Sequence, residues 1–500
     1  MKKSFLLLLI LTGSYFDAKP QTTIITHGYA ALLADPINGW MLDMANGICA
    51  RTGGGVVRVY NKATGNFDYK SGSGTRTILL FDWWDDSNDL HKGFSEGAGA
   101  ALFAALMKGN LQNDFNLNNL HFIGHSRGCT VNSEAIERLL VMGIPVEQET
   151  SVDAHDSGGL GIAVTDYDAN PDSINSGVEG WAGIGWADSY WQDALFSLNG
   201  RAVNGTFSEY KGTISHSGIH DWYLQTITDT TIHDGYYYSL LGGGSAHRPP
   251  RTGIQRNPFF TFSADGIMNG NFERGGVLYQ KIPGWWYHGG GGDADIDNTY
   301  LALHSGGYYK IHDRFYIPPY ANFIKFDYKI DTKDDNGTIP NMDKMIVLIN
   351  DSVVMDNIWM DNVMSNWSQL FINVSSYQNT VNTIEFRLVD GSGGSSNQDA
   401  KVWLDNIQFE MSAVPVIPNY TNAIRCNIYP NPASDKLFIE TLSSNILYVE
   451  LFDITGKSVF RENMKGPSAT LNIDKIKAGL YTYKITDVKE GVKTGKIIKI

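Results

Sequence analysis

Cysteine is scarce in this sequence, because the chain of 500 residues has only three, at Cys49, Cys129 and Cys426. Their odd number and wide spacing argue against a disulfide framework and against a zinc site with cysteine ligands. Positive charge is also in short supply: 39 lysines and arginines stand against 53 aspartates and glutamates, so the net charge is −14. Binding to the phosphates of nucleic acid requires a basic face, so we expect no nucleic-acid partner.

Long hydrophobic runs are missing as well. Residues 5–11 (FLLLLIL) are strongly apolar, but they fall well short of the roughly 20 residues that a membrane-spanning helix needs. The run follows Lys2 and Lys3, and a positive start before a short apolar core is typical of a signal peptide. We therefore expect residues 1–20 to direct the chain out of the cytoplasm.

Apolar and aromatic side chains, by contrast, are abundant. Hydrophobic residues make up 42% of the chain and aromatic residues 12%, which is enough for packed cores and unlike a disordered chain. At roughly 100–200 residues per domain, the length predicts about three domains.

Strand-like and helix-like patterns alternate over residues 21–256. ILLFDWW (78–84) and LHFIG (120–124) are typical of strands, whereas FSEGAGAALFAALM (94–107) and TVNSEAIERLLVM (130–142) are typical of helices. Repetition of strand and helix predicts an α/β domain, in which helices cover the faces of a sheet.

The helical pattern nearly vanishes after the Pro- and Arg-rich stretch 247–258. Residues 257–412 contain alternating segments such as FIKFDYKI and NTIEFRLV, separated by Gly, Asn and Asp clusters, and this pattern predicts a β-sandwich. A linker at 412–422 then leads to a smaller β unit at residues 424–500, in which lysines and arginines outnumber the acidic residues.

A candidate nucleophile lies between the predicted strand 120–124 and the predicted helix 130–142. The motif there is Gly124-His125-Ser126-Arg127-Gly128. A serine on a tight strand-to-helix turn is exposed, and glycines on both sides remove Cβ clashes in that crowded turn. The following helix N-terminus stabilises negative charge near the serine. The alternative is an ordinary Gly-Ser turn.

A second turn can supply an oxyanion hole. The short strand TTIIT (22–26) ends in His27-Gly28-Tyr29, and a glycine after a first strand allows a backbone N–H to point at the developing oxyanion. We assign this role to the backbone N–H groups of Tyr29 and Arg127. The alternative is that His27 and Gly28 form only a strand-ending turn.

The acid and the base of a triad follow in chain order. Asp153 stands where the predicted strand TSVD ends, and Asp156 follows in a Gly-rich loop; Asp153 is favoured as the acid. His216 and His220 are both candidates for the base, which must be neutral near pH 7 and within hydrogen-bond reach of the serine. His216 is favoured because it lies in a Ser-rich loop before the helical pattern starts.

Residues 22–245 resemble a lipase-type α/β-hydrolase. The resemblance is carried by THGY, by FDW after a strand, by GHSRG, by VDAHD and by a His followed six and seven residues later by Trp222 and Tyr223. It implies a doubly wound sheet, a triad of Ser126, Asp153 and His216, and no cofactor for catalysis. The sequence departs from the family at Ala154, where the family has proline, and in its lack of surface disulfides.

Residues 268–411 resemble the galactose-binding-like jelly-roll sandwich of carbohydrate-binding modules. The resemblance is carried by the opening NGNFE (269–273), the segment PGWW (283–286) and the closing VWLDNI (402–407). In such modules the opening glutamate and the closing aspartate share a structural calcium, which here implies Glu273 and Asp405.

Sugar binding by such sandwiches uses exposed aromatic faces that stack on pyranose rings. The candidate substrate-binding residues are Trp285 and Trp286, with Tyr287 beside them. The alternative is that Trp285 and Trp286 pack in the sandwich or against the hydrolase part.

The C-terminal unit resembles the type A sorting domain of the type IX secretion system. YPNPA (429–433) and AGLY (478–481) carry the resemblance. It implies entry into the periplasm by the signal peptide, recognition by the type IX secretion machinery, and a secreted or cell-surface protein.

Together these features predict an exported serine hydrolase that cleaves carboxylic esters, with a lipid or an acylated polysaccharide as substrate. Three alternatives stay open at this point. They are a carbohydrate esterase, a peptidase or amidase that uses the same triad, and a surface adhesin whose hydrolase domain is inactive.

Overall fold

The computed structural model describes residues 21–30, 35, 37–89, 93–156, 178–194, 198–255, 266–272, 282–289, 301–304, 308–330, 344–359, 366–389, 401–411, 426–430, 432–441, 446–453, 457–463, 468–487 and 492–500. These residues form two compact units. The first contains the α/β part and the β-sandwich, and residues 413–500 make up most of the second. The predicted signal peptide lies outside the described residues.

The α/β part is built on an eight-stranded sheet in the order β3-β2-β4-β1-β5-β6-β7-β8, counted over the described residues. Neighbouring strands are parallel except for β2 and β3, which form an antiparallel hairpin at one edge. The bounds are β1 (Thr22–Thr26), β2 (Gly55–Asn61), β3 (Asn66–Ser73), β4 (Thr77–Phe81), β5 (Leu120–His125), β6 (Val146–Val152), β7 (Trp186–Trp191) and β8 (Phe207–Tyr210).

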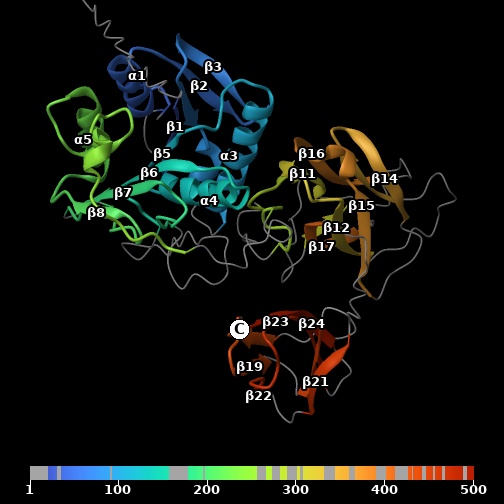
Figure 1. Ribbon diagram of the computed structural model, residues 1–500. Helices are drawn as coiled ribbons and strands as arrows, with labels where there is room; N and C mark the ends of the chain where they lie inside the picture. The colour runs from blue at the N-terminus through green and yellow to red at the C-terminus, as the bar shows by residue number, and fades with distance from the viewer. Residues whose placement is uncertain are drawn as a thin grey trace, which may run out of the picture. The chain divides into compact units, whose positions relative to one another are not determined.

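Helices cover both faces of this sheet (Figure 1). One buried core joins the sheet to α3 and α4, and a second core joins it to α1 and α5. The helices are α1 (Trp40–Thr52), α2 (Trp84–Ser87), α3 (Phe94–Leu111), α4 (Gly128–Val141) and α5 (His216–Thr228), with short 3₁₀ turns η1 (Gly235–Tyr238) and η2 (Ser245–His247). The predicted doubly wound α/β fold is thus confirmed. Over the part of the chain that the structure covers, no helix has the length and apolar character needed to cross a bilayer.

The central strands are buried on both faces, as their sequences require. Every residue of β1, β4 and β5 is buried, which explains why ILLF is continuously apolar and LHFI is apolar except for the buried His121, without alternation of apolar and polar residues. Because parallel strands end at the same edge, the turns after β1, β4, β5 and β6 meet there.

The middle part of the chain forms two antiparallel sheets, in the orders β10-β17-β12-β15 and β14-β13-β16-β11-β9. The predicted β-sandwich is therefore confirmed. Its elements are β9 (Trp286–Gly289), β10 (Leu301–His304), β11 (Tyr308–Ile317), β12 (Phe323–Ile330), β13 (Lys344–Ile349), β14 (Ser352–Trp359), β15 (Ser368–Asn373), η3 (Ser375–Tyr377), β16 (Thr380–Val389) and β17 (Lys401–Glu410).

The sandwich packs directly on α3 and on the β2–β3 hairpin. The rings of Phe103 on α3 and Tyr316 on β11 meet edge to face with centroids 5.7 Å apart, and both belong to one buried core. The guanidinium of Arg314 donates to the carbonyl oxygens of Lys62 (2.9 Å) and Ala63 in the hairpin turn. The sandwich and the α/β part therefore share one compact unit instead of being tethered only by a linker.

The C-terminal unit has two antiparallel sheets, β18-β19-β22 and β21-β20-β23-β24. Leu437, Val449, Leu471 and Ile485 are among the buried residues of its own small core. The strands are β18 (Cys426–Tyr429), β19 (Lys436–Thr441), β20 (Ile446–Phe452), β21 (Ser458–Asn463), β22 (Ser468–Asn472), β23 (Gly479–Asp487) and β24 (Val492–Lys499).

Candidate functional site

Ser126 occupies a strained turn between β5 and α4. Its φ is 57°, in the left-handed region that a serine rarely adopts. The turn is crowded: a Cβ on Gly128 would lie 2.5 Å from the carbonyl oxygens of Thr26 and His27. A strained serine on a strand-to-helix turn is the backbone geometry of a nucleophile elbow. Ser126 is nevertheless buried, at 2% exposure, so the expectation of an exposed serine is corrected.

Asp153 and His216 are in direct contact. The Nδ1–H of His216 donates to the Asp153 Oδ2 over 2.6 Å, and the Asp153 side chain is completely buried. His216 is the first residue of α5, and its position is fixed by Ser215, whose hydroxyl caps the helix by accepting from the Gly218 N–H at 3.0 Å.

The serine turn and the acid–base pair lie at the same edge of the sheet. The Ser126 N–H donates to the Val152 carbonyl oxygen, 3.1 Å away, so the turn that carries Ser126 is bonded to the strand end that carries Asp153. His125 contacts His216: its Nε2–H donates to the His216 carbonyl oxygen over 3.0 Å. The structure thus brings the three residues of the predicted triad into one neighbourhood.

The alternative acid and base have other partners. Asp156 is paired with Arg201, whose Nε–H donates to Oδ1 over 2.7 Å, and it also accepts from the Val178 N–H. His220 lies with its Nδ1 2.9 Å from Asp221 and stacks on Trp40 with ring centroids 4.7 Å apart. The geometry therefore favours Asp153 and His216 over Asp156 and His220.

The predicted oxyanion donors flank the serine. A Cβ on Gly28 would lie 2.4 Å from the Ser126 Cβ, so only glycine lets this turn approach the serine. The Tyr29 N–H that follows makes no hydrogen bond to any residue in the described part of the chain, as a donor reserved for a ligand requires. The Arg127 guanidinium donates to the carbonyl oxygens of Ser87 and Asp89, and these bonds fix the side chain of the residue that follows the serine.

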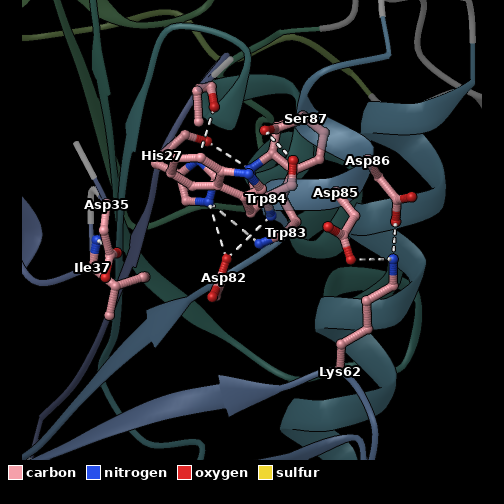
Figure 2. Close-up of polar contacts among 12 residues, drawn as sticks. His27, Asp35, Ile37, Lys62, Asp82, Trp83, Trp84, Asp85, Asp86 and Ser87 are labelled. Atoms are coloured by element: carbon pink, nitrogen blue, oxygen red, sulfur yellow. Dashed lines mark hydrogen bonds and ion pairs between the residues drawn. The ribbon is translucent and has the colours of Figure 1, made fainter. Parts of the chain in front are cut away.

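Trp83 fixes the Tyr29 turn through His27 (Figure 2). The Trp83 backbone N–H donates to the His27 Nε2 over 3.3 Å, and the Trp83 Nε1–H donates to the His27 carbonyl oxygen over 2.6 Å. The His27 Nδ1–H donates to the Gly28 carbonyl oxygen over 2.8 Å. The resemblance pointed to FDW as a motif, but its contact with His27 depends on the pairing of β1 with β4.

Gln192 holds Asp153 in place, and no motif in the sequence predicts this role. Its backbone N–H donates to the Asp153 Oδ1 over 3.0 Å, and its Nε2 donates to the Oδ2 over 2.7 Å. The same side chain donates to the Leu198 carbonyl oxygen and accepts from the Ala194 N–H. These bonds lock the Gln192 side chain and orient the carboxylate toward His216.

Two further histidines, His125 and His220, lie near the predicted base, and burial favours the neutral form of both. Burial, with smaller contributions from His216 and His220, keeps the pKa of His125 well below its ordinary value. Burial also lowers the pKa of His220, against the opposing effect of Asp221. Because neither carries a positive charge near pH 7, they do not oppose a proton on His216 during a reaction.

The predicted substrate-binding tryptophans differ in exposure. Trp285 is buried against Phe272, Phe315 and Phe386, so the expectation of an exposed stacking face is corrected for this residue: the sandwich core needs its apolar surface. Trp286 remains 36% exposed, with the Lys62 ammonium 4.5 Å from its ring centroid. The Tyr287 side chain lies outside the described residues.

The predicted calcium pair is described only in part. Asp405 lies in β17 and its Oδ1 accepts from the Asn406 N–H, whereas Glu273 lies outside the described residues. Within the ranges that the structure describes, His, Cys, Asp and Glu side chains form no group of three or more that could hold a metal ion. The calcium therefore stays a prediction.

Comparison with known families identifies the C-terminal unit. Residues 427–500 match the family described as the secretion system C-terminal sorting domain. Residues 427–500 therefore form a type IX secretion sorting domain. Such a domain implies recognition by the type IX secretion machinery and a secreted or cell-surface protein. Both expectations for this unit are confirmed.

Other similarities are short or remote. The chain is 27% identical over 104 residues to an endo-acting ulvan lyase from Formosa agariphila, a match that covers 21% of this chain and 20% of that protein. The chain therefore spans about a fifth of the length of this curated relative.

Among solved structures, PorZ, a type IX secretion component of Porphyromonas gingivalis, is 18% identical with a TM-score of 0.14, covering 19% of this chain and 14% of PorZ. A β-glucuronidase from Faecalibacterium prausnitzii is 10% identical with a TM-score of 0.15, covering 38% and 36% of the two chains. Likenesses this weak carry no argument about activity.

Proposed function

We propose that this protein is an exported serine hydrolase of the lipase and esterase type, which cleaves carboxylic esters. The observation that carries the proposal is the 2.6 Å contact between His216 and the buried Asp153, next to a serine held at a φ of 57°. A buried carboxylate bonded to a histidine, beside a strained serine after a β-strand, is the arrangement that activates a hydroxyl for attack on a carbonyl.

The reaction follows from the roles of these groups. Ser126 Oγ forms a bond to the ester carbonyl carbon while the His216 Nε2 takes the hydroxyl proton, and the carbonyl oxygen becomes an oxyanion that accepts from the N–H groups of Tyr29 and Arg127. As the C–O bond to the alcohol breaks, His216 returns the proton to the departing oxygen. Water then repeats the sequence on the acyl-serine and releases the carboxylic acid.

Asp153 serves the charged intermediate. It holds the imidazole by its Nδ1–H and stabilises the imidazolium that forms when Nε2 is protonated. The two bonds from Gln192 keep the carboxylate in place for that purpose. The sorting domain accounts for the exported location of such an enzyme.

The test is hydrolysis of p-nitrophenyl esters from acetate to palmitate by the full-length protein and by Ser126→Ala. We expect the variant to lose at least about 10⁴-fold in kcat, because members of a triad act as a unit. The exposed Ser376→Ala in η3 is the matched control and should retain wild-type rates. Wild-type rates in Ser126→Ala would refute the nucleophile.

The same assay separates the alternatives. Turnover of p-nitroanilides in preference to the esters would indicate a peptidase or amidase. No turnover of any ester or anilide by folded wild-type protein would leave the adhesin, with an inactive hydrolase domain, as the better interpretation.

A further inference from the structure

A cavity of about 300 Å³ lies in the first unit, where the α/β part meets the sandwich. Its walls come from the end of β4 and the turn into α2, from the start of α3, and from the sandwich segment 282–286 with Asp313 of β11. The residues proposed to act on the ester bond do not line it. Its volume falls at the lower end of the range for small-ligand pockets.

Carboxylates dominate the polar part of its wall. Asp82, Asp85, Asp86 and Asp313 all line the cavity, and Lys62 lines it beside them. The Lys62 Nζ lies 3.2 Å from Asp86 and 3.7 Å from Asp85 (Figure 2). The lysine therefore offsets part of the charge of its two neighbours, and the wall as a whole stays negative.

Asp313 has the properties of a partner for hydroxyl groups. Its Oδ1 accepts from the Arg314 N–H over 2.7 Å, and burial raises the pKa of its carboxyl to about 7. A carboxyl that is protonated for part of the time near neutral pH can both donate and accept a hydrogen bond, as a hydroxyl does.

The rest of the wall is aromatic. Phe81, Trp83, Phe94 and Trp285 line the cavity, and Trp286 closes one side with the Lys62 ammonium over its ring. Flat apolar surface beside carboxylate acceptors suits a sugar residue, whose C–H faces pack on aromatic rings while its hydroxyls donate to oxygen acceptors.

One residue of the cavity wall is hydrogen-bonded to the predicted oxyanion turn. Trp83 forms part of its wall and makes the two hydrogen bonds to His27, the residue before Gly28 and Tyr29. The Arg127 guanidinium lies 5.4 Å from the centroid of the Trp83 ring. Trp83 therefore links the wall of the cavity to the turn that carries one of the predicted oxyanion donors.

The carboxylates of the wall argue against anionic ligands and against acyl chains. The negative wall repels uronic acids, sulfated sugars and fatty-acid carboxylates, and an acyl chain would cover the carboxylates without satisfying them. Among the described residues, His, Cys, Asp and Glu side chains form no group of three or more that could hold a metal ion. The Lys62 ammonium already lies beside Asp85, Asp86 and Trp286, where a cationic ligand would bind.

We propose that this cavity binds a neutral sugar residue of the ester substrate, so that the substrate is an acylated saccharide. The inference rests on the proposed ester hydrolysis, which it makes specific. It also gives the sandwich a direct part in substrate recognition, through Asp313 and the aromatic wall.

Binding is tested with the full-length protein and unacylated probes: cellobiose, xylobiose and mannobiose as neutral disaccharides, and digalacturonate as an anionic one. Isothermal titration calorimetry should detect a neutral disaccharide and should show digalacturonate binding at least about ten-fold more weakly. Asp313→Asn should weaken neutral binding about ten-fold, because the amide cannot replace the ionised form of the carboxyl, whose hydrogen bonds are stronger than those of a neutral group. Asp351→Asn, an exposed residue on the same sandwich, is the control and should bind as wild type does.

A second variant guards against a folding defect in Asp313→Asn. Ala101→Leu adds apolar volume to the cavity wall from α3 without changing charge, and it should also weaken binding. Failure of every neutral disaccharide to bind at tens of millimolar would overturn the proposal. So would unchanged binding in both variants, each shown to be folded by its melting temperature, or tighter binding of digalacturonate.

Hydrolysis of p-nitrophenyl acetate, measured in parallel, separates the two proposals. If the protein hydrolyses p-nitrophenyl acetate but binds no sugar, the proposed saccharide site is refuted and the proposed ester hydrolysis stands. Sugar binding without hydrolysis of any ester would refute the proposed function. With both intact, the ratio of kcat/KM for acetylated xylobiose to that for p-nitrophenyl acetate should fall about ten-fold in Asp313→Asn.

Discussion

Asp153 is held from two sides, by His216 and by Gln192. Gln192 is fully buried at the end of β7 and reaches both oxygens of the carboxylate. The backbone of Asp153 has a φ of 52°, in the left-handed region that residues other than glycine rarely adopt. This conformation therefore depends on the hydrogen bonds around the residue. The position of the Asp153 carboxylate is therefore set partly by a neutral amide, which has no part in the proton transfer proposed for this site.

Replacing Gln192 by Ala should lower kcat by about 10–100-fold with little change in KM. The side-chain bond to the charged carboxylate is lost, while the residues that contact the ester stay in place. Steady-state kinetics on p-nitrophenyl acetate measure both constants. Gln225→Ala, on the exposed face of α5, is the control and should be neutral. A change confined to KM would refute the positioning role.

Glu149 predicts a pH dependence of stability. The residue lies on β6, and its two carboxylate oxygens are buried with no hydrogen-bond partner among the residues that the structure describes. Burial raises the pKa of its carboxyl to about 8. The folded state therefore holds a proton that the unfolded chain releases at lower pH, so this group stabilises the fold at low pH and loses that contribution as pH rises toward about 8.

Glu149→Gln should reduce this loss. Wild-type stability should fall on the order of a few kcal/mol more than that of the variant between about pH 5 and pH 8. Urea unfolding of the full-length protein at both pH values gives the comparison, and the exposed Asp351→Asn should leave the wild-type pH dependence unchanged. Equal losses in wild type and Glu149→Gln would show that Glu149 is not the titrating group.

At the scale of elements, α3 is the helix with two partners. It packs on the central sheet and on α4, and on its other side it meets the sandwich through Phe103 and Tyr316. Its sequence is apolar or small around most of its circumference, and a helix of that kind is buried on more than one side. The sandwich is thus part of what keeps α3 out of water.

Tyr316→Ala should therefore destabilise the first unit by about 2–4 kcal/mol, the range for loss of a large buried side chain. Tyr309, on the same strand β11, is 40% exposed, so Tyr309→Ala should cost much less. Urea unfolding of both variants measures the difference. Equal costs would mean that the α3 contact contributes little to stability.

Element types could be predicted where local periodicity was strong. The helices predicted at 94–107 and 130–142 are α3 (Phe94–Leu111) and α4 (Gly128–Val141), because small and apolar residues recur there at helical spacing. The strand predicted at 78–84 ends early, at Phe81, since Trp84 starts the short α2. That boundary depends on the docking of Trp83 against His27, which no local pattern encodes.

The candidate site also contains some residues that local sequence motifs predict and others that only tertiary contacts reveal. Ser126, Asp153 and His216 were identified from turns whose residues are adjacent in the chain. Gln192 could not be, because its role requires β7 to lie beside β6. The cavity could not be either: Asp82 and Asp313 belong to different parts of the chain and meet only through the packing of the sandwich on the α/β part.

At the scale of the whole molecule, the sorting domain decides where the proposed hydrolase is delivered. It has its own small core and its own excess of basic residues, in a chain whose net charge is −14. Deleting residues 424–500 should therefore retain active hydrolase in the periplasm while leaving its kinetics unchanged. Fractionation of the native host, with ester hydrolysis as the readout, tests this. Undiminished activity of the truncated protein in the medium would contradict the role of the tail.

The position of β1 also sets an order of events during synthesis and export. β1 lies in the middle of the sheet and pairs with β4 on one side and β5 on the other, so its partners become available only after the residues up to His125 have emerged from a translocation pore. All eight strands of the sheet precede the sorting domain at residues 427–500. Since domains fold as units as the chain emerges, the parallel sheet can close before the sorting signal exists in folded form. The secretion machinery that recognises the sorting domain would then meet this protein with its parallel sheet already assembled instead of as an unfolded chain.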